Sequence, residues 1–142
     1  MRKSVDASAR TLLFDAGPLV AAIDRSDEHH GWAKRILPKL TGRAITCEPC
    51  VTEALHLLEN APRAIAALRG FLERIEIVPV LPTEFTDVFD QLETFAPAMD
   101  LADGCLVNLQ RRIPTSIVVT TDHRDFATYR VPFLSPMGLF TD

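Results

Sequence analysis

The chain has 142 residues, of which 47% are hydrophobic and 24% are charged, and its formal net charge is −4. This length suits one domain with a real hydrophobic core, and no run approaches the roughly 18 to 20 apolar residues that a membrane span requires. The negative charge argues against a protein that holds nucleic acid mainly by releasing counterions from phosphates.

The first ten residues, MRKSVDASAR, are basic and polar and lack the apolar core of a secretory signal. We therefore predict a flexible N-terminal extension over residues 1–10 and a single domain over residues 11–142. Three cysteines are an odd and low number. This count argues against a disulfide framework and predicts a reducing, cytoplasmic location.

Short apolar runs alternate with helical patterns along the chain. Strands are predicted over TLLF (11–14), AIT (44–46), IEIVPV (75–80), SIVVT (116–120) and, weakly, VPFLSP (131–136). Helices are predicted over LVAAIDR after Gly17-Pro18, over about 31–40, after Pro49, and over about 61–73, 83–95 and 101–112. Strands separated by helices predict a mostly parallel sheet in a three-layer α/β/α sandwich.

The helix predicted over about 83–95 is amphipathic. Its acidic residues suit a solvated face, opposite an apolar stripe at helical spacing made of Phe85, Val88, Phe89 and Leu92. We therefore expect this stripe to face the core.

Four carboxylates fall where this topology brings separate segments together. Asp15 ends the first strand and Asp122 ends SIVVT. Glu53 lies one turn into the helix after Pro49, and Asp103 lies in the first turn of the helix that begins at residue 101. Ligands of open parallel sheets bind beyond the carboxyl ends of the strands. We therefore expect all four side chains to share one pocket.

Four carboxylates in one pocket would repel each other unless cations lay among them. Their hard oxygen atoms suit Mg²⁺ or Mn²⁺. A pair of such ions about 3.5–4 Å apart is the usual device for in-line attack of water on a phosphodiester. The pattern therefore favours metal-dependent hydrolysis that needs no side-chain nucleophile.

Each aspartate also has a purely structural explanation. Asp15, Asp100 and Asp122 could cap the helices or turns that follow them, and Asp103 could complete a capping box with Asp100. Glu53 has no such explanation, because it lies too far into its helix to cap it. Taken together, the four acids favour a metal site.

Four blocks of the chain, LLFDAGPLVAAIDRSDEHHGWA, TCEPCVTEAL, MDLADGCLV and VVTTDHRDF, resemble in order and spacing a PIN domain, most closely the VapC-type toxins of toxin–antitoxin pairs. The resemblance implies a metal-dependent endoribonuclease with a five-stranded parallel sheet flanked by helices. It assigns the four acidic positions to Asp15, Glu53, Asp103 and Asp122, and Asp100 is an additional candidate.

The same resemblance implies partners. These are an RNA substrate, a small antitoxin that covers or enters the acidic groove, and a second copy of the chain in a homodimer whose two sites lie on one face. One residue departs from the family pattern, and one position of that pattern has two candidates. Gly104 stands where relatives usually carry alanine, and Asp125 competes with Asp122 for the last acidic position.

Two other functions remain open. Cys47-Glu48-Pro49-Cys50 at a helix start suits a thiol–disulfide oxidoreductase, because a helix N-terminus lowers a cysteine's pKa. A non-catalytic binding module on the same fold is the third possibility.

Several other residues attract weaker interpretations. Glu53 and His56 have the Glu-x-x-His spacing of di-iron bundles, but no second copy occurs, so a packing or surface role is favoured for His56. Candidate phosphate contacts, for which surface solvation is the default, are Arg111, Arg112, Arg124 and Arg130.

Overall fold

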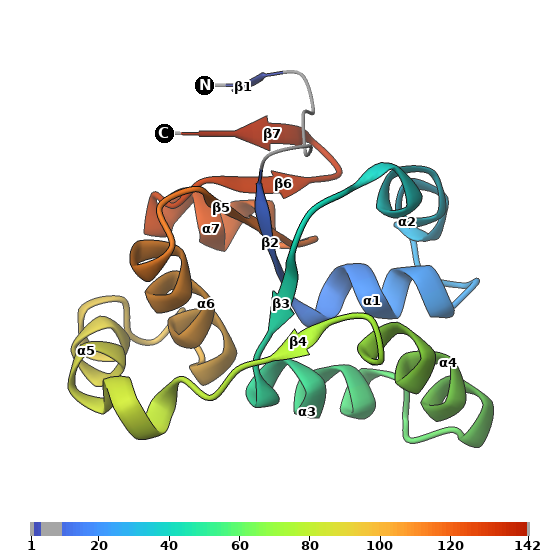
Figure 1. Cartoon of the computed structure of the whole chain (residues 1–142), viewed down its shortest axis with the longest axis horizontal. Coiled ribbons are helices and arrows are strands. Elements are labelled where there is room, and N and C mark those ends of the chain that lie inside the picture. Colours follow the sequence, from blue (N-terminus) through green and yellow to red (C-terminus); the bar gives the residue numbers. More distant parts are fainter. Residues whose placement is uncertain (1, 4–9, 142) are drawn as a thin grey trace.

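A seven-stranded sheet with the order β1-β7-β6-β5-β2-β3-β4 runs through the computed structural model, which describes residues 2–3 and 10–141 (Figure 1). Five of its strands are parallel: β2 (Thr11–Phe14), β3 (Ala44–Thr46), β4 (Glu76–Ile77), β5 (Ser116–Val119) and β6 (Phe133–Ser135). These are the five predicted strands, and the mostly parallel α/β/α architecture is confirmed.

Two groups of helices cover the two faces of the sheet (Figure 1). On one side lie α1 (Ala16–Ile23), α2 (His30–Ile36) with the short 3-10 helix η1 (Leu37–Lys39), α3 (Glu48–Leu57) and α4 (Pro62–Leu72). On the other side lie α5 (Leu81–Thr94), α6 (Leu101–Arg112) and α7 (His123–Tyr129). Among the helices of the described residues, none is both long and apolar enough to cross a membrane.

The central strands are buried on both faces because successive side chains point to opposite sides of a sheet. In β2, Leu12 and Phe14 pack into the cluster beneath α1 and α4, whereas Leu13 packs into the cluster beneath α6. In β5, Ile117 and Val119 face the first cluster and Val118 the second. This double burial explains why these strands are continuous apolar runs in the sequence.

Three elements were not predicted. The strand β7 (Gly138–Phe140) pairs antiparallel with β6, and β1 (Arg2–Lys3) pairs antiparallel with β7. The segment after Asp122, expected to be a turn, is the helix α7. Of the predicted N-terminal extension, residues 1 and 4–9 lie outside the described residues, and the extension stays a prediction.

The apolar stripe expected on α5 is only partly buried. Val88 is fully buried, but Phe85 is 57% exposed and Phe89 is 42% exposed. The two rings stack on each other with centroids 4.5 Å apart. The prediction that the whole stripe faces the core was therefore wrong: Val88 and Leu92 pack into the core cluster, whereas Phe85 and Phe89 lie largely in solvent.

Replacement of Gly104 by alanine should stabilise the protein. A Cβ at this position of α6 would meet Leu92 Cδ2 at 3.4 Å and Val88 Cγ1 at 3.5 Å, which is ordinary van der Waals contact. Because glycine costs about 0.5–1 kcal/mol relative to alanine inside a helix, Gly104→Ala should raise the free energy of unfolding by about that amount. Urea unfolding would measure it.

Gly70→Ala in α4 is the matched control, since a Cβ there would meet nothing within 4 Å. It reports the gain from helix propensity alone. A loss of stability in Gly104→Ala, beside a gain in Gly70→Ala, would contradict the packing argument for position 104.

Candidate active site

Asp15 follows β2 and begins α1. One carboxylate oxygen, Oδ1, accepts the backbone N–H of Ala16 at 2.8 Å, and the other, Oδ2, accepts the hydroxyl of Thr120 at 2.8 Å. The side chain is buried, with 7% exposure. Burial raises the pKa of Asp15 to about 6, with smaller increases from the charges of Asp100 and Asp122, although both hydrogen bonds act in the opposite direction.

Thr120 connects Asp15 to Asp122. Its hydroxyl donates to Asp15 and accepts the backbone N–H of Asp122 at 2.9 Å. Asp122 is the N-cap of α7 and accepts the backbone N–H of Asp125 at 3.0 Å. One buried hydroxyl therefore fixes the carboxyl ends of two neighbouring parallel strands relative to each other.

Asp103 lies in the first turn of α6, with 7% exposure. Its Oδ2 accepts the Tyr129 hydroxyl at 2.9 Å, and its backbone N–H donates to Oδ1 of Asp100, the N-cap of this helix, at 2.8 Å. Burial raises the pKa of Asp103 well above its usual range, and the charges of Asp100 and Asp15 raise it further. The hydrogen bond from Tyr129 only partly offsets this.

Glu53 projects from α3, one turn after Pro49. Its pKa is raised to about 7, first by burial and then by the charges of Asp15, Asp100 and Asp122. Glu53 therefore lies close enough to these three carboxylates to feel their repulsion. Its place in the helix, one turn after Pro49, is the one that the sequence predicted.

The structure thus brings together five carboxylates, which we name the carboxylate cluster: Asp15, Glu53, Asp100, Asp103 and Asp122. Figure 1 shows β2 and β3 ending beside the starts of α1 and α3, the helices that begin after Asp15 and carry Glu53. Asp15, Asp100 and Asp122 do cap helices, as the structural explanation requires. Capping and clustering are therefore not alternatives here, because the same caps hold the carboxylates in place.

The donor set of the cluster suits a hard divalent cation. It consists of carboxylate oxygens, and the raised pKa values reflect burial and repulsion that a bound cation would relieve. Within residues 2–3 and 10–141, no group of three or more His, Cys, Asp or Glu side chains already surrounds a point where an ion could sit. The described side chains therefore do not form a ready-made metal site.

Two positioning residues were missed by the sequence analysis, Thr120 and Tyr129. Thr120 directly precedes the Thr121-Asp122 pair at the end of β5, so a buried hydroxyl at a strand end was a usable signal. Tyr129 lies 26 positions from Asp103, and no local pattern links them. Its ring packs edge-on against Phe95 and Phe126, which directs the hydroxyl to the carboxylate.

Gly17 marks a close approach between two segments of the site. A Cβ at Gly17 would overlap the hydroxyl of Thr121. Gly17 lies two residues after Asp15, and Thr121 directly precedes Asp122. The absence of a side chain at position 17 therefore allows the starts of α1 and α7 to approach each other.

The thiols do not have the properties of a redox centre. Cys47, Cys50 and Cys105 are free and buried, and the Cys47 and Cys50 sulfur atoms lie 3.5 Å apart. A hydrogen bond with Cys105 lowers the pKa of Cys47, but the hydrogen bond with Cys50 and burial outweigh it, so this pKa is raised well above its usual range. The alternative of a thiol–disulfide oxidoreductase is therefore not supported, because it requires a lowered pKa at Cys47.

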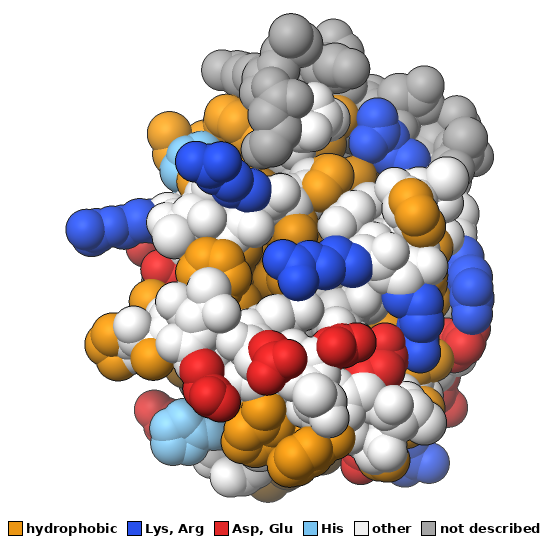
Figure 2. Space-filling view, turned by 90° about the vertical axis from the view of Figure 1, so that its left-hand side faces the viewer, with side chains coloured by type: hydrophobic (Ala, Val, Ile, Leu, Met, Phe, Trp, Pro, Cys, Tyr) orange, Lys and Arg blue, Asp and Glu red, His pale blue; other side chains and the backbone are white. Residues whose placement is uncertain are grey.

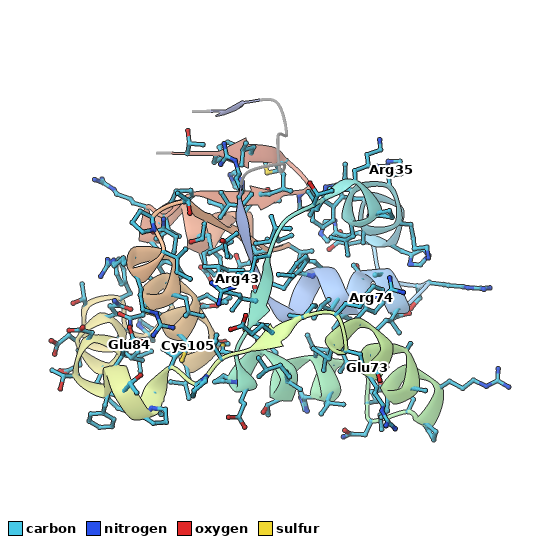
Figure 3. All side chains as sticks on the ribbon, viewed as in Figure 1. Arg35, Arg43, Glu73, Arg74, Glu84 and Cys105 are labelled. Carbon is cyan, nitrogen blue, oxygen red and sulfur yellow. The ribbon has the colours of Figure 1, made fainter. Side chains whose placement is uncertain are left out.

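The arginines of α6 belong to a separate surface. Arg112 forms an ion pair with Glu84 of α5 at 2.9 Å, and a cavity of about 600 Å³ between these helices is lined by Arg111, Arg112 and acidic residues of α5. Figure 2 shows a row of acidic side chains below basic ones on this side, and Figure 3 labels Glu84 at the α5–α6 contact and Cys105 on α6. Arg112 is therefore engaged by α5 as the structure stands.

No model of a known protein family matches the chain, and no curated protein matches its sequence. Several solved structures resemble it, among them the following two. The toxin VapC20 of Mycobacterium tuberculosis, described as cleaving the sarcin–ricin loop, is 18% identical, with a TM-score of 0.72 over 82% of this chain and 94% of VapC20. DNA-bound VapBC from Salmonella typhimurium is 15% identical, with a TM-score of 0.57 over 83% of this chain and 91% of the matched chain.

At these identities the likeness concerns the fold. The chain has the PIN-like fold of VapC proteins, as the sequence motifs predicted. The assignment of functional residues stays a prediction. The assigned residues are Asp15, Glu53, Asp103 and Asp122, with Asp100 or Asp125 as further candidates.

The raised carboxylate pKa values predict a pH-dependent stability in the metal-free protein. Asp15 and Glu53 hold their protons to about pH 6 and 7 in the folded state, against ordinary values of 3.8 and 4.5. The folded state therefore binds more protons than the unfolded state between these values, and stability should fall as pH rises through this window. Melting temperatures in EDTA across this range would measure it.

Addition of Mn²⁺ should restore much of the lost stability above pH 7 and little near pH 5, where protons compete for the carboxylates. Ca²⁺ and Mg²⁺ can be compared in parallel. A metal-free melting temperature that rises from pH 5 to pH 7.5 would contradict the repulsion inferred from the cluster.

Proposed function

We propose that the protein is a divalent-metal-dependent endoribonuclease, and that it is the toxin of a toxin–antitoxin pair. The observation that carries this proposal is the carboxylate cluster itself. Separate segments of the chain supply buried acids at the carboxyl ends of parallel strands, and desolvation and mutual repulsion raise the pKa values of three of them. Such an arrangement is costly unless cations are bound there, and bound cations would in turn attract an anionic substrate.

The residues that would hold Mg²⁺ or Mn²⁺ are Asp15, Glu53, Asp103 and Asp122, with Asp100 at the rim. When bound, such ions activate water and stabilise the charge that develops on a phosphodiester during in-line displacement. The protein's own contribution is orientation. Thr120 holds Asp15, and Tyr129 holds Asp103, each through one hydrogen bond to one carboxylate oxygen. Lone pairs on the carboxylates remain available for a ligand.

The likeness to VapC structures supports RNA as the substrate, because VapC20 is described as a toxin that cleaves the sarcin–ricin loop. It also supports a small antitoxin as a partner, since the second similar structure is a VapBC complex. A toxin should arrest the growth of cells that express it, and the Asp103→Asn variant should not. Equal growth arrest by both proteins would argue against toxicity through this site.

A homodimer is part of the same proposal. The exposed, stacked pair Phe85 and Phe89 on α5 is an apolar surface of the kind that interfaces cover. Sedimentation velocity should show a dimer for the wild type and a shift towards monomer for Phe89→Ser. A monomeric wild type at all concentrations would remove the homodimer from the proposal.

Substitution of the cluster should abolish RNA cleavage. With Mn²⁺ present, Asp15→Asn and Asp103→Asn should each lose more activity than the roughly 100-fold typical of losing an outer partner of a metal ligand. EDTA should abolish wild-type cleavage. Asp87→Asn is the matched control, because this exposed acid of α5 lies outside the cluster, and it should retain wild-type activity. EDTA-resistant cleavage, or full activity in both cluster variants, would disprove the metal-dependent mechanism.

The Tyr129→Phe variant should show whether Tyr129 orients the Asp103 carboxylate or only packs in the core. The phenylalanine keeps the ring that packs against Phe95 and Phe126 but removes the hydroxyl that donates to Asp103. Because outer hydrogen-bond partners of metal-binding carboxylates typically contribute about 10- to 100-fold, cleavage should fall by at least about tenfold while the fold is kept. Steady-state cleavage and circular dichroism would be measured together, and unchanged cleavage would remove Tyr129 from the site.

A further inference from the structure

A cavity of about 590 Å³ opens directly from the carboxylate cluster, between α3 and the start of α6. Two members of the cluster, Glu53 and Asp100, form part of its wall. The rest of the wall is mixed: it has the apolar side chains of Pro49, Leu101 and Ala102 and the polar side chains of Glu48, Thr52 and His56. The cavity is therefore a continuation of the proposed active site rather than a separate pocket.

The cavity offers apolar surface and an aromatic ring beside the cluster. Leu101, the first residue of α6, is 36% exposed. His56 lies three positions after Glu53 on α3, so both side chains lie on one face of that helix and both line the cavity. Unstacked nucleobases bind to proteins through such combinations, with the base plane against apolar and aromatic groups.

The charges at the cavity restrict what can occupy it. Three carboxylates, Glu48, Glu53 and Asp100, line it, and no arginine or lysine does so. A phosphate would be repelled, so the cavity is unsuited to the RNA backbone. Carboxylates accept hydrogen bonds from exocyclic amino groups of bases, such as N4 of cytosine, and present no donor for the O4 atom of uracil.

We propose that this cavity binds the base of a nucleotide adjoining the scissile phosphate in single-stranded RNA, and that it prefers a base with an exocyclic amino group to uracil. The proposal rests on the proposed ribonuclease function and adds a source of sequence preference to it. Leu101 and His56 supply the contact with the base plane, and Glu48 accepts the hydrogen bond from the amino group.

The test uses short single-stranded RNAs that differ at one position flanking the cleaved bond, which carries cytidine, uridine or an abasic site. With Mn²⁺, the wild type should cleave the cytidine RNA roughly tenfold more efficiently than the uridine and abasic RNAs. Leu101→Ser and His56→Ala should lower kcat/KM for the cytidine RNA by roughly tenfold and leave kcat/KM for the abasic RNA unchanged. Glu48→Gln should reduce the difference in cleavage efficiency between the cytidine RNA and the uridine RNA.

Leu57→Ala is the matched control. Leu57 is the neighbour of His56 on α3 and is 49% exposed, but it does not line the cavity. Its substitution should therefore leave cleavage of all three RNAs unaffected. Binding provides a readout independent of catalysis. In the Asp103→Asn background with Ca²⁺, fluorescence anisotropy should show that His56→Ala and Leu101→Ser weaken binding of the cytidine RNA and not of the abasic RNA.

The outcomes distinguish the two proposals. A wild type that cleaves no RNA with Mn²⁺ overturns the ribonuclease function, and the binding experiment then decides about the cavity alone. A wild type that cleaves RNA with the same efficiency for cytidine, uridine and abasic substrates overturns the base site and leaves the ribonuclease function standing. If the cavity variants lose equal cleavage efficiency on the cytidine and abasic RNAs, the proposed base site would also be overturned.

Discussion

Repulsion between buried carboxylates is the interaction that the rest of this structure has to accommodate. Asp15 and Asp103 are almost completely buried, and the charges of neighbouring acids raise their pKa values further. Helix caps and the hydroxyls of Thr120 and Tyr129 hold the acids together despite this cost. Folding alone gives no reason to gather these charges, and the arrangement becomes favourable once positive charge enters the site.

The parts of the fold that local sequence patterns determine could be predicted. The central parallel strands are short apolar runs because helices bury them on both faces, and the acids Asp15 and Asp122 follow two of these runs. The position of Glu53 was predictable because Pro49 sets the first turn of α3. In each case, the residue follows a parallel strand in the sequence, and the carboxyl ends of parallel strands lie at the same edge of the sheet.

The features that could not be predicted depend on contacts between distant segments. The hydrogen bond from Thr120 to Asp15 spans 105 positions, and the strands β1 and β7 pair residues from the two ends of the chain. Phe85 and Phe89 follow the spacing of a buried stripe but are exposed, because a helical pattern does not say how much of a helix its neighbours cover. The Cys-x-x-Cys motif left a thiol function open for a similar reason, since its sequence does not reveal that the cysteines are buried.

The close approach of Gly17 and Thr121 has a consequence for how this site can change over generations. A side chain at position 17 would collide with the Thr121 hydroxyl, so a larger residue there requires Thr121 to shift or a smaller residue to replace it. The two positions, far apart in the chain, are therefore expected to vary jointly among descendants of this sequence. Random mutagenesis that permits one substitution at a time should therefore accept fewer residues at position 17 than a library that varies both positions.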